Sequence, residues 1–94
     1  MTNITLSGRR KLSAGEIELI VSGHEKFIAR RPGGKRAILK FVDLSGADLA
    51  GRNLADADVS ASIFDGAKMA GLNLERAILF GCDLRKADLR RARL

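Results

Sequence analysis

From Ala37 onward, the chain repeats every five residues. An α-helix places apolar residues about every 3.6 positions and a half-buried strand places them at every second position, so neither element alone has this period. A sustained period of five requires a repeat solenoid, in which each five-residue unit is one structural step. The fifth-residue series holds twelve large apolar residues without a gap: Leu39, Leu44, Leu49, Leu54, Val59, Phe64, Met69, Leu74, Leu79, Leu84, Leu89 and Leu94.

Written as pentads, the repeat reads AILKF, VDLSG, ADLAG, RNLAD, ADVSA, SIFDG, AKMAG, LNLER, AILFG, CDLRK, ADLRR and ARL. This pattern resembles the pentapeptide-repeat family, whose unit reads A-(D/N)-L-x-x. The resemblance covers residues 37–94 and implies a mainly β fold, a right-handed, quadrilateral parallel β-helix. One pentad then forms each side, its central residue and the residue two before it point inward, and the chain makes just under three coils.

The family architecture places residue n over residue n+20, separated by the spacing of neighbouring strands, about 4.8 Å. Side chains in the expected columns are complementary in charge or form an amide ladder. The columns are Asp48/Lys68/Asp88, Asp65/Arg85, Asp56/Arg76 and Asn53/Asn73. We therefore expect a register of twenty residues between coils.

Two inward positions depart from the pattern, because Leu72 and the charged Arg52 stand where a small residue is usual. A guanidinium group is not buried without a partner. We therefore expect the chain to bulge at that corner.

The first 36 residues form a separate basic element with no five-residue period, and their net charge is +5 from eight Lys or Arg and three Glu. Ser13 to Glu16 has the form of a capping box, so a helix is predicted to begin at Ala14. Apolar residues then recur at spacings of three and four until Pro32, which predicts a capping helix over about residues 14–31. The expected domains are 1–36 and 37–94. Residues 2–8 could form a short strand before the helix.

The amphipathic helix has two sites on which to lay its apolar stripe. The open first coil exposes unpaired backbone and the edge of the core, so the helix is predicted to act as an N-terminal cap. The alternative is an outward apolar patch on one side of the stack. The helix or a partner protein would cover this patch, which consists of Ile38, Phe41, Ile78 and Phe80.

The last repeat stops at its central residue, Leu94, before the third coil closes. Two explanations stay open. If the chain is truncated, more pentads follow. If Leu94 is the natural terminus, the open coil favours an end-to-end homodimer, which the family resemblance also implies for some members.

No residue pattern predicts catalysis, a metal or a cofactor. His24 and Glu25 begin a zinc-protease motif, but position 28 is Ile, so His24 is expected at the edge of the helix. Cys82 occupies an inward small position and is interpreted as a packed thiol. The Gly33-Gly34 segment lacks the spacing of a phosphate loop and reads as a linker. The aspartates project outward at fixed spacing and do not converge.

The net charge of +6 leaves a second interpretation open. Basic side chains gather in the last coil and can bind anions such as nucleic-acid phosphates. They alternate with aspartates and no aromatic platform accompanies them, which favours solvated charge. The anion-binding candidates are Arg85, Lys86, Arg90, Arg91 and Arg93.

The favoured function is a non-catalytic scaffold that binds a protein partner. Nucleic-acid or anionic-surface binding is the alternative. The family resemblance also suggests mimicry of DNA toward topoisomerases, but that activity needs an acidic surface, and this repeat carries a net charge of +1. A single cysteine and the absence of a membrane-length apolar run predict a cytoplasmic protein without membrane insertion.

Overall fold

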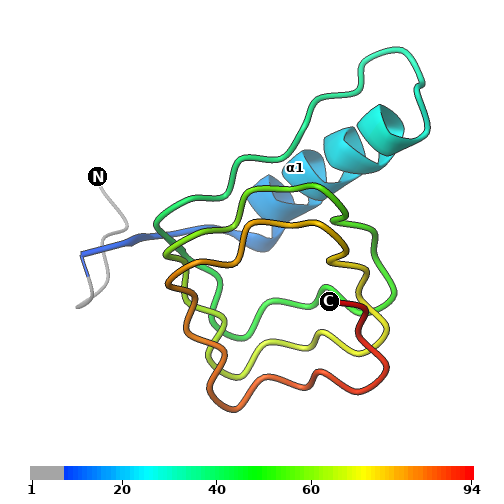
Figure 1. Ribbon diagram of the computed structural model, residues 1–94. Coiled ribbons are helices and arrows are strands. Elements are labelled where there is room, and N and C mark those ends of the chain that lie inside the picture. Colours follow the sequence, from blue (N-terminus) through cyan, green and yellow to red (C-terminus); the bar gives the residue numbers. More distant parts are fainter. Residues whose placement is uncertain (1–7) are drawn as a thin grey trace.

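The computed structural model describes residues 8–94, and three short elements precede or begin the repeat. Strand β1 (Arg10–Lys11) is followed by helix α1 (Ala14–Ile28) and strand β2 (Val42–Asp43). The strands β1 and β2 pair in parallel. The rest of the chain winds into stacked coils, with α1 lying beyond one end of the stack (Figure 1).

Isolated parallel bridges join residues that are twenty apart, such as Ile38 with Asp58 and Asp58 with Ile78. The backbone N–H of Leu39 donates to the Asp58 carbonyl at 2.7 Å, and the N–H of Asp58 donates to the Ala37 carbonyl at 3.1 Å. The predicted register is therefore confirmed. We define the first coil as residues 37–56, the second as 57–76 and the last as 77–94.

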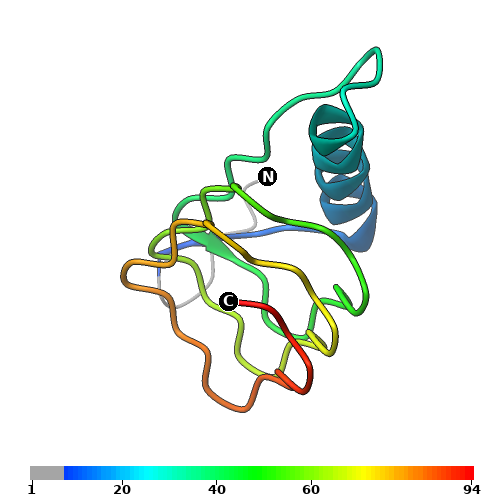
Figure 2. The same cartoon turned by 45° about the vertical axis from the view of Figure 1, so that its right-hand side comes forward.

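Only β2 forms a strand within the repeat, although the sequence predicted a mainly β fold. The reason is that the last residue of each pentad, from Phe41 to Arg91, has a left-handed φ between 53° and 73°. These corners interrupt the extended backbone every five residues, so pairing is reduced to single bridges. Glycine, which adopts this conformation without strain, occupies some of the corners. Figure 2 shows the resulting coils from a second side.

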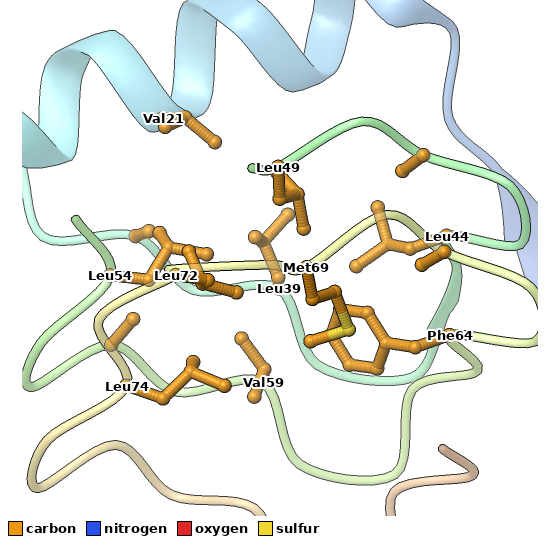
Figure 3. Close-up of a cluster of buried hydrophobic side chains, with 14 of the residues drawn as sticks. Val21, Leu39, Leu44, Leu49, Leu54, Val59, Phe64, Met69, Leu72 and Leu74 are labelled. Carbon is orange, nitrogen blue, oxygen red and sulfur yellow. The ribbon is translucent and has the colours of Figure 1, made fainter. Parts of the chain in front are cut away.

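The inward central residues stack into one continuous core, shown in Figure 3. Phe64 and Met69 of the second coil are fully buried. Val21 of α1 is also fully buried and points into this core from the helix. In the last coil, Leu84 and Leu89 are only partly buried. Burial is therefore most complete between α1 and the second coil.

Helix α1 begins where the capping box predicts. The Ser13 hydroxyl oxygen accepts the N–H of Glu16 at 3.1 Å, and the Ser13 N–H donates to the Glu16 carboxylate at 2.9 Å. These two bonds satisfy backbone donors that the first helical turn leaves free.

The predicted end of the helix at residue 31 is wrong, because α1 ends at Ile28. Arg30 adopts a left-handed φ of 57°. The N–H of Arg31 then donates to the Lys26 carbonyl at 2.9 Å, as in a Schellman motif. Arg30 stands where glycine is usual, so no residue before Pro32 signals the end of the helix. The short strand expected at residues 2–8 lies almost wholly outside the described residues.

Candidate functional site

Helix α1 supplies hydrogen-bond partners to the first coil, which has no preceding coil to pair with. The backbone N–H of Asn53 donates to the Glu25 carboxylate at 3.0 Å, whereas the equivalent N–H of Asn73 donates to a backbone carbonyl. Strand β1 also supplies partners to the first coil, because its backbone pairs in parallel with residues 42–43. The N-terminal segment thus completes the pairing of pentads 42–46 and 52–56.

His24 contributes to the same arrangement and is completely buried, so its predicted place at the helix edge is wrong. The N–H of Ala37 donates to His24 Nδ1 at 2.9 Å, which makes Nδ1 an acceptor. Nε2 therefore carries the proton and donates to the Ala55 carbonyl at 2.6 Å. The imidazole connects the helix with two backbone groups and has no role as a metal ligand or base in this position.

Arg52 joins the first coil to the helix through two carboxylates, and we call this set the helix clamp. Its guanidinium group lies 2.7 Å from Glu18 and 2.8 Å from Glu25. The hydrogen bonds from Arg52 lower the pKa of Glu18 to about 2 and hold the pKa of Glu25 below its usual value.

The bulge expected at Arg52 is absent. The N–H of Gly51 donates to the Ala70 carbonyl at 2.9 Å, and the N–H of Asn73 donates to the Arg52 carbonyl at 3.0 Å. The backbone pairing therefore continues through this corner. The side chain reaches the helix carboxylates, so the inward position causes no distortion.

The apolar patch of Ile38, Phe41, Ile78 and Phe80 is exposed, with exposed fractions of 53%, 52%, 44% and 86%. Ile38 and Ile78 both bridge to Asp58, which places them on the same side of the stack. The Arg9 guanidinium lies 4.4 Å above the ring of Phe41. Helix α1 packs over the core at the end of the stack, so it does not cover this patch.

A groove of about 350 Å³ lies between α1 and the start of the first coil. This groove was not predicted, although the sequence contains one signal for it: Leu19 is a large apolar residue outside the apolar stripe of the helix. In the structure Leu19 is 77% exposed. Ile38 belongs to both the groove and the apolar patch. The residues that line the groove are Leu19, Ile20, Gly23, Lys35, Arg36, Ala37 and Ile38.

Most of the basic residues in the last coil have carboxylate partners. Arg85 pairs with Asp83 at 2.6 Å, and Arg90 pairs with Asp88 at 2.8 Å. Arg93 pairs with Glu75 at 3.0 Å. Within residues 8–94, the anion-binding candidates without an ion pair are Lys86 and Arg91.

The family model for pentapeptide repeats matches eight copies of the repeat, over residues 43–79 and 64–94. The chain belongs to the pentapeptide-repeat family. The search of curated proteins gave no match. Membership is consistent with a repeat protein that has no enzymatic activity, and the repeat implies a β-helix solenoid.

The other motifs serve packing in this pentapeptide-repeat protein. The Cys82 thiol donates to the Val59 carbonyl at 2.9 Å, and burial raises its pKa. A Cβ atom on Gly34 would lie 2.5 Å from the backbone nitrogen of Phe27, so glycine is needed there for close contact with the helix.

Metal-ligand clusters and membrane-spanning helices are both absent from residues 8–94. No His, Cys, Asp and Glu side chains in this part of the chain gather as a set of metal ligands. No helix there has the length and apolar character required to span a membrane.

Proposed function

We propose that this chain is a non-catalytic protein-interaction module, built on a right-handed, four-sided β-helix that presents the apolar patch to a protein partner. The twenty-residue register supports four pentads in each coil. The observation that carries the functional proposal is the exposure of four large apolar side chains on one side of the stack: Ile38, Phe41, Ile78 and Phe80.

The chemistry of the patch fits protein recognition. Exposed apolar side chains that share one side of a molecule mark interaction surfaces, and aromatic residues are frequent anchors in them. Here they form two pairs, one in the first coil and one in the last, with Asp58 of the second coil between Ile38 and Ile78. Phe41 contributes a half-exposed aromatic ring at the corner of its pentad.

The alternative, binding of nucleic acid or another anionic surface, has weaker support. Ion pairs with Asp83, Asp88 and Glu75 neutralise three of the five candidate cations. Mimicry of DNA toward topoisomerases would need an excess of acidic side chains, and the whole chain carries +6.

We also propose that, if Leu94 is the natural terminus, the last coil supports a homodimer. Leu94 is 67% exposed at the end of the stack opposite α1. Pairing of two such ends would cover its side chain and the partly buried Leu84 and Leu89. Analytical ultracentrifugation should show a dimer that the Leu94→Glu substitution converts to monomer, and a monomeric wild-type chain contradicts this proposal.

Photocrosslinking tests the partner proposal. A benzophenone amino acid at position 80 is expected to crosslink to a protein in cells, whereas the same group at exposed position 68 provides the control. The Ile78→Ser substitution should abolish the crosslink from position 80. Equal crosslinking from both positions, or crosslinking to nucleic acid alone, argues against the interaction module.

A further inference from the structure

The first pentad of the first coil has an open backbone edge. In the coils below, the N–H groups of Asp58 and Ile78 donate to the preceding coil at 3.1 and 2.9 Å. The Asp58 and Ser60 carbonyls accept bonds from the preceding coil at 2.7 and 3.0 Å. The corresponding groups of the first coil are the N–H of Ile38 and the carbonyls of Ile38 and Lys40. Within residues 8–94, none of these three groups has a hydrogen-bond partner.

This open edge lies beside the groove, because Ala37 and Ile38 form one of its walls. Leu19 and Ile20 of α1 form the opposite apolar wall. An extended segment on the edge would meet backbone donors and acceptors on one side and apolar side chains around it. Alternate residues of such a segment point to opposite faces, so one apolar side chain can enter the groove.

The first coil has a second open edge, in pentad 47–51, but its surroundings differ. The hollow beside it is lined by the charged residues Lys11, Glu18, Asp48 and Arg52. The ion pair between Arg52 and Glu18 crosses this hollow at 2.7 Å. Lys11 also bonds there to the Ser45 carbonyl. Charged groups that already have partners make this edge a poor site for an apolar segment.

The charge around the groove identifies the kind of segment that fits. Lys35 and Arg36 line the groove, and none of its lining residues is acidic. Lys40, whose carbonyl belongs to the open edge, has an exposed side chain. The nearby Asp58 carboxylate is bonded to the Ser60 hydroxyl and N–H. A second copy of this basic chain would bring like charges together, whereas carboxylates on the incoming segment would be complementary.

We propose that an extended, acidic segment of a partner protein adds as a strand to the edge of pentad 37–41. Its backbone pairs with Ile38 and Lys40, one apolar side chain enters the groove between Leu19 and Ile38, and its carboxylates lie near Lys35 and Arg36. This inference rests on the proposed interaction module and specifies its partner.

Amide hydrogen exchange in the free 94-residue chain tests the open edge first. The Ile38 amide should exchange rapidly, whereas the equivalent amides of Asp58 and Ile78 should be protected, since they are bonded to the preceding coil. Protection of Ile38 in the free chain would show that the chain's own residues occupy the edge, and would overturn the proposal.

A random dodecapeptide library, selected on the full chain, tests the occupant. We expect enrichment of peptides with an apolar residue flanked by Asp or Glu. Their binding should protect the Ile38 amide, weaken with salt, and fall about tenfold when alternate peptide nitrogens are methylated. No enrichment, basic peptides, or tolerance of N-methylation at every position overturns the proposal.

Matched variants separate this site from the apolar patch. Leu19→Asp should weaken peptide binding about tenfold, whereas Phe80→Ser should leave peptide binding unchanged. Both positions are exposed. Ile38→Asp should also weaken peptide binding, but Ile38 belongs to both surfaces and does not distinguish them. Peptides that lose affinity with Phe80→Ser but not with Leu19→Asp would refute the groove and retain the interaction module.

Discussion

The Nε2 atom of His24 lies 2.6 Å from the carbonyl oxygen of Ala55 and takes the place of a backbone N–H from a preceding coil. One coil further on, the Glu75 carbonyl accepts the N–H of Asp56 at 2.9 Å. Ala55 and Glu75 are twenty residues apart and therefore occupy equivalent positions. A helix side chain thus continues the hydrogen bonding of the solenoid beyond its first coil.

Replacement of His24 by Leu should lower the free energy of unfolding by about 2 to 6 kcal/mol, since two buried backbone groups would lose their partners at about 1 to 3 kcal/mol each. These groups are the Ala37 N–H and the Ala55 carbonyl. Urea denaturation measures the change. Lys26→Ala, on the exposed side of the same helix, is the control and should change the value by less than about 0.5 kcal/mol. A loss for His24→Leu no larger than that of the control would contradict the role of His24.

Arg52→Ala should lower the free energy of unfolding by about 0.5 to 2 kcal/mol, although Ala is the usual residue at this position of the repeat. The substitution leaves Glu18 and Glu25 without their cation. Double-mutant cycles measure how each carboxylate contributes. Glu25 is 34% exposed and Glu18 is 60% exposed, so coupling of Arg52 to Glu25 should be the stronger. Equal coupling energies would contradict this ranking.

The repeat made the stacking register predictable from the sequence alone. The Asn53–Asn73 bridge and the Asp56–Arg76 ion pair are both found as expected. The expected partner of Arg85 was Asp65, but Arg85 pairs with Asp83 of its own repeat at 2.6 Å. Backbone register is imposed by every coil at once, whereas an exposed side chain has several carboxylates within reach.

The attachment of the helix was not predictable in the same way. The spacing of Glu18 and Glu25 places both on one face of a helix, two turns apart, and Arg52 is an irregular residue in the repeat. Together these were a signal of the helix clamp, but nothing local in the sequence joins residues 27 or more positions apart. The burial of His24 has the same origin, because it depends on how the helix lies over the coil.

Acid should weaken the helix clamp. The pKa of Glu18 is lowered to about 2 and that of Glu25 is also lowered, chiefly by hydrogen bonds from Arg52. Carboxylates of this kind stabilise the folded state fully above their ordinary pKa of 4.5, and the stabilisation is lost as the pH falls toward the folded values. The difference in unfolding free energy between wild type and Arg52→Ala should therefore shrink as the pH falls from 4.5 toward 2. The other carboxylates are present in both proteins, so their effects cancel in this comparison. A difference in unfolding free energy that stays constant over this pH interval would contradict the prediction.

The corners of the coils allow a final prediction, in which one substitution has opposite effects at two glycines. Gly66 has a left-handed φ of 69°, and a Cβ atom there would contact nothing within 4 Å. Gly66→Ala should therefore lower the free energy of unfolding only by the backbone strain, about 1 to 2 kcal/mol.

Gly15 lies in α1 without a left-handed φ, and a Cβ atom would meet only the Ser13 hydroxyl at 3.9 Å. Gly15→Ala should stabilise the chain by about 0.5 kcal/mol, because alanine favours the helix. Thermal and urea unfolding of the two variants should move in opposite directions, and a stabilised Gly66→Ala chain would mean that the corner conformation imposes no strain on residues with a side chain.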